Sequence, residues 1–291
     1  MNARPTSAEA PRTLGEMLAL ARGFLERKGT GEPRLEAELL VAHAVGLTRL
    51  QVFLQLDRPV NESEVARARE LLVRRGKREP VAYIRGEREF YGRAFRVDRS
   101  VLIPRPETEL LVDLARELAK ASGAPSKIAD VGTGSGCLAV TLALEFSGAS
   151  VHAVDVSDEA LAVARGNAER LGACVEFVRG DGPRALAAAA PFDLVVSNPP
   201  YIDPAERASL EPDVRDFEPA LALFTPERDP DHWLRRLLDE GARLLAPGAT
   251  LLVELGLGQA PRAASLAAER GFSARTKKDF SGVERVLIVT R

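Results

Sequence analysis

Residues 128–140 read IADVGTGSGCLAV, and this stretch decides the fold class. A short apolar run enters a loop that has glycine at every second position, and a second apolar run follows. Glycine permits sharp turns and lets the backbone approach a ligand where a side chain would collide. We interpret the stretch as a strand, a ligand-binding loop and the start of a helix.

The sequence after Leu110 repeats this alternation of short apolar runs and helical segments. Strands are expected at residues 128–131, 151–154, 175–178, 194–196, 251–255 and 286–289. Such alternation is typical of an α/β fold with a doubly wound, mostly parallel sheet. Ligands of these sheets bind beyond the carboxyl ends of the strands, which is where the glycine loop lies.

The residues before Leu110 predict two further parts. Apolar side chains at helical spacing predict helices near residues 14–25, 35–45 and 62–75. The stretch REFYGRAFRVDRSVLI at 88–103 alternates in character around Gly92, which predicts a hairpin. The expected organisation is a disordered extension (1–12), a helical domain (13–80), a hairpin linker (81–104) and an α/β domain (105–291).

Composition narrows the class of protein. The chain has 291 residues, 45% of them hydrophobic, and 40 basic against 42 acidic side chains. A net charge this close to zero produces no overall electrostatic attraction to nucleic acid or to an anionic membrane. No apolar run is long enough to span a bilayer, and the first residues lack the apolar core of a secretory signal. Two cysteines and three scattered histidines have no disulfide or metal-site spacing. We therefore expect a soluble, cytoplasmic protein without a metal. The cysteines and histidines in question are Cys137, Cys174, His43, His152 and His232.

The glycine loop and the next strand indicate a cofactor with a ribose. Asp155 ends that strand and follows Gly132 at about the 20-residue separation of a ribose-binding acid. The third glycine comes one position earlier than in the dinucleotide fingerprint, and Asp130 precedes the loop. This G-x-G-x-G pattern resembles the first motif of class I S-adenosylmethionine-dependent methyltransferases. The resemblance implies that methyl donor; a nicotinamide site and a turn without a ligand are the alternatives.

A second motif, VSNPPYI at residues 196–202, follows the fourth strand and therefore faces the same crevice. A planar NH2 nitrogen is a poor nucleophile because its lone pair is delocalised. The side-chain oxygen of Asn198 and the backbone oxygen of Pro199 can each accept one of its N–H groups. We predict catalytic roles for Asn198, Pro199 and Tyr201, and a flat substrate pocket that also includes Pro200. A strand terminator without a ligand is the alternative.

Five stretches together resemble the peptide chain release factor glutamine methyltransferases, the PrmC/HemK family. They are EPVAYIRGEREFYG (79–92), VLIPRPETELLV (101–112), DVGTGSGCLAV (130–140), VSNPPYI (196–202) and LEPDVRDFEPALALF (210–224). The resemblance implies a seven-stranded methyltransferase sheet, a small N-terminal helical domain that recognises the substrate, and a hairpin linker. It also implies methylation of the glutamine in the Gly-Gly-Gln loop of class I release factors.

The same resemblance implies a set of cofactor-binding residues, with Asp181 on the adenine side and IPRPETE near the methionine end. The set is Gly132, Thr133, Gly134, Ser135, Gly136, Asp155, Asp181, Gly182, Asn198, Arg105, Glu107 and Thr108. For IPRPETE the alternative is a capped helix start. Gly182-Pro183 departs from the bulkier residue common in the family, and the role of TPERDPDHWLRRL (225–237) is open.

Other functions remain as alternatives. One is N-methylation of adenine or guanine in a nucleic acid, because the exocyclic amine of these bases is also a planar NH2 group. The chain lacks the clear basic or aromatic recognition module that such an enzyme would need. A nicotinamide oxidoreductase or a non-catalytic binding protein is also open. The basic run at residues 74–78 (Arg74, Arg75, Lys77 and Arg78) is interpreted as a solvated helix end, with a docking patch as the alternative. We expect a monomer whose partners are class I release factors, with no stable nucleic-acid or membrane partner.

Overall fold

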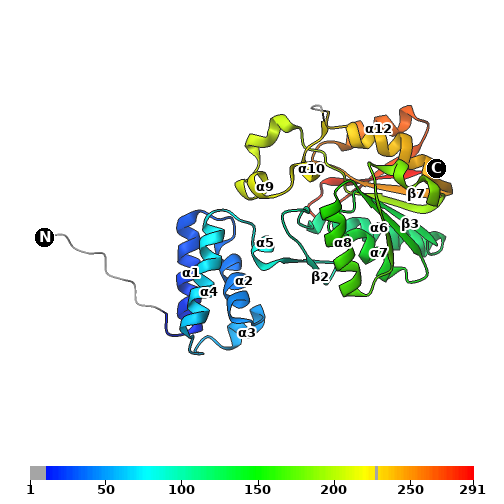
Figure 1. Cartoon of the computed structure of the whole chain (residues 1–291). Coiled ribbons are helices and arrows are strands. Elements are labelled where there is room, and N and C mark those ends of the chain that lie inside the picture. The colour runs from blue at the N-terminus through cyan, green and yellow to red at the C-terminus, as the bar shows by residue number, and fades with distance from the viewer. Residues whose placement is uncertain (1–10, 227–228) are drawn as a thin grey trace. The chain divides into compact units, whose positions relative to one another are not determined.

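The computed structural model describes residues 11–226 and 229–291 (Figure 1). The chain divides into two compact units, one ending at Gly86 and the other beginning at Glu87. The expected extension at residues 1–12 lies outside the described residues except for its last two positions. No helix among the described residues is both long enough and apolar enough to cross a membrane.

The first unit is helical, as predicted. Its helices are α1 (Leu14–Lys28), α2 (Pro33–Val45), α3 (Arg49–Leu54), α4 (Glu62–Gly76) and α5 (Val81–Arg85). Side-chain caps begin three of them: Thr13 accepts a hydrogen bond from the Glu16 amide at α1, and capping boxes start α3 and α4, Thr48 with Gln51 and Asn61 with Glu64. Apolar faces of α1, α2 and α4 pack into one core around Leu25 and Leu40.

One expectation for this unit is wrong in part. The basic run at residues 74–78 is not simply a solvated helix end, because Arg75 is 3% exposed and bonds both carboxylate oxygens of Glu36 in α2. Arg74 makes a paired contact with Glu79. The run therefore ties α4 to α2 and to the segment after α4, so only part of its charge faces solvent.

The second unit holds a seven-stranded sheet of order β5-β4-β3-β6-β7-β9-β8. Its strands are β3 (Lys127–Val131), β4 (Ser150–Asp155), β5 (Val175–Arg179), β6 (Phe192–Ser197), β7 (Leu245–Glu254), β8 (Ser273–Lys278) and β9 (Glu284–Thr290). The strands from β5 to β7 are parallel, and β9 and β8 are antiparallel to their neighbours. The predicted doubly wound, mostly parallel sheet is confirmed.

Helices cover both faces of this sheet (Figure 1). One apolar core joins the sheet to α6 (Glu109–Ser122), α7 (Cys137–Glu145) and α8 (Asp158–Leu171). A second core lies against α12 (Ala260–Glu269). Between β6 and β7 the chain forms the short helices α9 (Pro212–Phe217), α10 (Ala220–Leu223) and α11 (His232–Arg236).

The predicted hairpin is formed by β1 (Glu87–Phe90) and β2 (Arg93–Arg96). Tyr91 and Gly92 occupy the turn with φ of 50° and 70°, the positive values that the tightest hairpin turns require. Phe90 and Phe95 are buried in the core shared with α6, α7 and α8. The hairpin is therefore packed as part of the second unit.

Asn167 in α8 links this hairpin to the glycine loop. Its Oδ1 accepts from the Arg96 amide at 2.8 Å, and its Nδ2 donates to the carbonyls of Arg96 at 3.0 Å and Ser135 at 2.9 Å. The side chain is fully buried. Its removal leaves the buried Ser135 carbonyl and the partly buried backbone N–H and carbonyl of Arg96 without this partner, and a polar group left unpaired on burial lowers stability.

We expect Asn167→Ala to lower the free energy of unfolding by roughly 2 kcal/mol, because the buried Ser135 carbonyl and the partly buried backbone groups of Arg96 lose their partner. Urea titration followed by circular dichroism measures the loss. Glu169→Ala, at an exposed position of the same helix, is the matched control and should change stability little. Equal stability of the two variants would contradict the linking role.

Candidate functional site

A single cavity lies beyond the carboxyl ends of the parallel strands and gathers most of the predicted site residues. Loops after β3, β4, β5 and β6 line it, together with the segment before α6. The predicted residues in its wall are Arg105, Thr108, Gly132, Thr133, Gly134, Ser135, Asp155, Asp181, Gly182, Asn198, Pro199 and Pro200. Three other predicted residues, Glu107, Gly136 and Tyr201, do not line it.

The three glycines of the loop have two different uses. Gly132 and Gly134 have φ of 77° and 55°, and a Cβ added at either would meet no other described atom within 4 Å. The backbone at both positions therefore borders open space, so a ligand can approach it closely. Gly136, with φ of 79°, lies under α8, where an added Cβ would be 3.0 Å from the Cβ of Ala164. Its role is the packing of α7 against α8.

Two carboxylates hold the loop in place. Asp155 at the end of β4 accepts from the amides of Gly134 at 2.8 Å and Ser157 at 3.0 Å. Asp130 is buried behind the loop and accepts from the Thr133 hydroxyl at 2.7 Å and the Ala139 amide at 3.2 Å. Burial raises the pKa of Asp130 to about 7. Asp155 is only partly buried and lines the cavity, so its carboxylate is available to a ligand there.

Asn198 is oriented by side chains from two other segments. Its Nδ2 donates to the Thr108 hydroxyl at 3.0 Å, and that hydroxyl donates to Oε2 of Glu254 at 2.6 Å. Ser197 fixes the end of β6 by donating to the Val131 carbonyl at 2.8 Å. In the described part of the chain the Asn198 Oδ1 atom has no hydrogen-bond partner, so it remains free to accept one.

Tyr201, for which a substrate contact is predicted, is not among the residues that line the cavity. Its ring packs against the backbone after β7, where a Cβ added to Gly256 would be 2.7 Å from the ring Cδ2 atom. The Gly256 amide in turn donates to Oε1 of Gln259 at 2.8 Å. Burial raises the pKa of the Tyr201 hydroxyl. In this structure the ring supports the turn after β6 and leaves the flat wall of the cavity to Pro199 and Pro200.

The motifs at 101–112 and 210–224 meet beside the cavity. Arg105 donates to Oε1 of Glu218 at 2.6 Å, and Oε2 of Glu218 accepts from the Ile103 amide at 3.1 Å. Glu218 is buried, so the pair anchors both segments. Glu107 is exposed and is not among the residues that line the cavity.

The segment whose role the sequence left open contributes to the cavity. Trp233 in α11 lines it, and the Arg236 guanidinium lies 4.8 Å from the Trp233 ring centroid. Arg236 also donates to Oδ1 and the carbonyl oxygen of Asp181, both at 2.9 Å. An added Cβ at Gly182 would be 2.7 Å from Nη2 of Arg236, so the small residue at this position makes room for the guanidinium.

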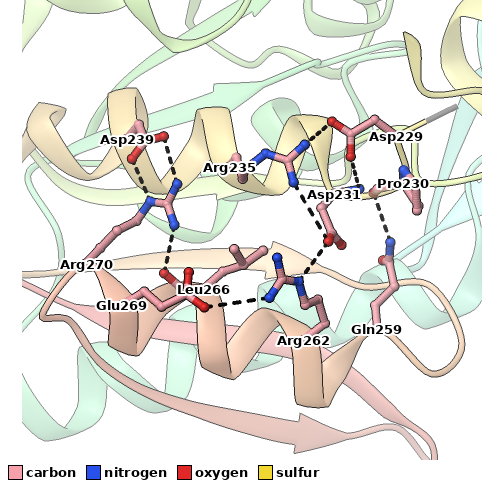
Figure 2. A network of polar contacts seen from close by, with 10 residues as sticks. All are labelled: Asp229, Pro230, Asp231, Arg235, Asp239, Gln259, Arg262, Leu266, Glu269 and Arg270. Atoms are coloured by element: carbon pink, nitrogen blue, oxygen red, sulfur yellow. Dashed lines mark hydrogen bonds and ion pairs between the residues drawn. The ribbon is translucent and has the colours of Figure 1, made fainter. Parts of the chain in front are cut away.

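A polar network ties α11 and the residues around it to α12 (Figure 2). Asp231 accepts from Nε of Arg262 at 3.1 Å, and the amide of Gln259 donates to the Pro230 carbonyl at 3.1 Å. Farther along, Arg270 bonds both oxygens of Asp239, at 2.6 and 3.0 Å. These contacts hold Trp233 at the cavity, because they connect α11 to α12, which packs on the sheet.

The cavity fits a methyl donor built on a nucleoside. Open backbone at Gly132 and Gly134 lies beside the Asp155 carboxylate, which suits ribose hydroxyls, and Trp233 offers a flat face near Asp181 for a purine. Its lining is mostly apolar, as pockets for small ligands usually are. The chemistry of these groups matches the predicted S-adenosylmethionine.

Comparisons with known proteins agree with this geometry. The sequence profile of the PrmC N-terminal domain matches residues 16–86, and that of the methyltransferase small domain matches residues 107–211. A release factor glutamine methyltransferase from Nitratidesulfovibrio vulgaris is 41% identical over 284 residues, covering 96% of this chain and 95% of the relative. One from Chlorobaculum tepidum is 43% identical over 281 residues, covering 94% and 95%.

The fold also resembles a solved structure. A methyltransferase from Pyrococcus furiosus superposes with a TM-score of 0.50 and 19% sequence identity, covering 69% of this chain and 90% of that one. At this level of identity the likeness concerns the fold alone.

Proposed function

Because this chain belongs to the release factor glutamine methyltransferase family, we propose that it methylates the glutamine of the Gly-Gly-Gln loop in class I release factors. The chain is an S-adenosylmethionine-dependent methyltransferase that acts on a protein glutamine. The observation that carries the proposed site is the free Oδ1 of Asn198, which lies in the wall of the same cavity as the glycine loop.

In the proposed reaction, Asn198 and Pro199 grip the substrate amide. The Asn198 Oδ1 atom and the Pro199 carbonyl oxygen each accept one N–H, which fixes the nitrogen with its lone-pair face toward the donor. Proline supplies that carbonyl on a stiff backbone and adds no competing N–H donor. When bound, the cofactor supplies an electrophilic methyl group on a positively charged sulfur.

The proton balance requires no strong base before transfer. With S-adenosylmethionine bound, its methyl group would pass to the amide nitrogen held by Asn198 and Pro199, the donor sulfur would keep the electron pair of the broken carbon–sulfur bond, and the nitrogen would lose one proton after transfer. Positioning and exclusion of water supply the rate enhancement. For the donor we propose Gly132, Gly134 and Asp155 at the ribose and amino-acid moieties, with Asp181 and Trp233 on the adenine side.

We further infer that the helical unit recognises the release factor and that the enzyme acts as a monomer without a stable nucleic-acid partner. Support comes from the match of residues 16–86 to the PrmC N-terminal domain and from a net charge of −2. Proteins that bind nucleic acid without a basic surface are uncommon because phosphate contacts supply much of the affinity.

Mass spectrometry of a purified class I release factor tests the substrate. The factor is incubated with this enzyme and S-adenosylmethionine, with total RNA and DNA as parallel acceptors. We expect one added methyl group, on the glutamine of the Gly-Gly-Gln loop. Methyl transfer to nucleic acid alone would retain the donor site and overturn the substrate.

The proposed position of Trp233 predicts an effect on donor affinity. We expect Trp233→Ala to raise the Kd for S-adenosylmethionine about tenfold, because stacking of a base on an aromatic ring contributes roughly 1–3 kcal/mol. Isothermal titration calorimetry measures the Kd. Phe280→Ala is the matched control, since Phe280 is a fully exposed aromatic residue of the same unit. Equal Kd values in the two variants would place the adenine elsewhere.

A further inference from the structure

Glu254 at the end of β7 is a buried carboxyl group that the proposed reaction does not use. It is 3% exposed, and Thr108, which donates to it, is 2% exposed. Thr108 in turn accepts from Asn198, so three polar side chains from separate segments form one line that ends at the substrate amide's proposed acceptor. A buried polar network of this kind fixes geometry when every member is satisfied.

The number of protons available to Asn198, Thr108 and Glu254 fixes which group donates in each of their hydrogen bonds. A hydroxyl carries one proton, and an ionised carboxylate only accepts. With Glu254 ionised, the Thr108 proton points to Glu254, and the hydroxyl oxygen can only accept from Asn198. The Asn198 amide must then direct its NH2 group at Thr108 and its Oδ1 atom at the cavity.

Protonation of Glu254 removes this constraint. A neutral carboxyl group can donate to the Thr108 oxygen, and the Thr108 proton is then free to meet Oδ1 of Asn198. An amide turned in this way presents its NH2 group to the cavity. Two N–H donors facing each other cannot grip the substrate glutamine, so this state is inactive.

We propose that the charge of Glu254 selects, through Thr108, which end of the Asn198 amide faces the glutamine. Glu254 and Thr108 are thus positioning residues for methyl transfer, and the inference rests on the proposed role of Asn198. Its consequence is an enzyme whose methylation rate falls on acidification because the acceptor is turned away from the substrate.

The surroundings of Glu254 place this change near neutral pH. Burial is the main cause that raises the pKa of Glu254 to about 7, and the Thr108 hydrogen bond opposes it. Both nearby guanidinium groups already have carboxylate partners, Arg285 with Asp279 and Arg105 with Glu218. The titratable and charged groups that face Glu254 are Arg285 from β9, Arg105 and Glu107 from the segment before α6, Tyr201 after β6, and Cys137 in α7.

The effect of this carboxyl on stability has the opposite sign to its effect on activity. The folded state raises the pKa of Glu254, so it binds the proton that the unfolded state has already lost. The stabilising contribution of Glu254 is therefore full below its ordinary pKa and is lost as pH rises toward about 7. Loss of activity below neutral pH through Glu254 cannot be a consequence of this group unfolding the enzyme.

Single-turnover methylation of a class I release factor, at saturating S-adenosylmethionine and from about pH 5.5 to 8.5, tests the inference. Wild type should show a rate that rises with pH, the acid limb of the profile, and reaches a plateau above about pH 7. Glu254→Gln cannot ionise and should lose this acid limb, with a plateau lowered about threefold to tenfold because Gln can face Thr108 with either end of its amide. Thr108→Ser retains the hydroxyl and should keep the acid limb.

Thr108→Val interrupts the same hydrogen-bond network at a different residue, and it serves as the test if Glu254→Gln does not fold. It removes the hydroxyl at similar volume and, at saturating S-adenosylmethionine, should give a low rate without the acid limb. An unchanged acid limb in Glu254→Gln or in Thr108→Val overturns the inference alone. Absence of methylation by wild type at every pH overturns the proposed function with it.

Discussion

Replacing Asn198 by alanine is expected to lower the rate of glutamine methylation by at least about 10²-fold, the effect typical of losing one preorganised polar contact at a reacting group. The Oδ1 atom is free of protein partners in the described structure, while Nδ2 is held by Thr108. Alanine removes the acceptor that orients the substrate nitrogen and leaves the glycine loop and Asp155 untouched. Single-turnover methylation of a class I release factor measures the rate.

Donor binding separates this loss from a general defect. The Kd for S-adenosylmethionine should stay within a few-fold of wild type, because the main donor contacts proposed for the loops after β3 and β4 remain. Glu206→Ala, an exposed position shortly after the motif, is the matched control and should retain full activity. Retained turnover in Asn198→Ala would remove Asn198 from the reaction.

The sheet was predictable because buried parallel strands are apolar on both faces. All six expected strands are present, and this reason applies to β3, β4, β6 and β7, whereas β5 lies at the edge of the sheet and β9 is a buried antiparallel strand. The antiparallel strand β8 has the sequence SARTKK and has no fully buried residue, so it carries no apolar pattern. It is a strand because β9 pairs with it, which is a tertiary cause that a local pattern does not express.

The candidate site was predictable where residues directly follow strands. The glycine loop, Asp155 and Asn198 each come after an apolar run, and the carboxyl ends of parallel strands meet at one edge of the sheet. Glu254 also ends a strand, but only its burial and its contact with Thr108 distinguish it from an ordinary surface carboxylate.

Trp233 and Arg236 were not predictable for another reason. They lie in a short helix without an apolar period, and charged contacts to α12 position this helix (Figure 2). Such contacts depend on which side chains the fold brings together. The packing of the Tyr201 ring against Gly256 was likewise not predictable, since the motif gives no signal for that contact.

Replacing Asp155 by alanine is expected to raise the Kd for S-adenosylmethionine by roughly 10²- to 10³-fold. The carboxylate holds the amides of Gly134 and Ser157, and in the proposed site it also accepts from the ribose hydroxyls. Two hydrogen bonds to a charged group contribute about 3–4 kcal/mol together, which corresponds to that change in Kd. Isothermal titration calorimetry with the donor measures it directly.

The matched control is Asp158→Ala. Asp158 is an exposed aspartate three positions later that pairs with the exposed Arg179, so its removal should change the Kd little. Because Asp155 also supports the loop, the thermal unfolding of both variants is compared without ligand. A Kd in Asp155→Ala equal to that of the control would show that the ribose lies away from this carboxylate. Weak donor binding with an unchanged Tm would locate the lost free energy in the donor contact, because a collapsed glycine loop would lower the Tm as well.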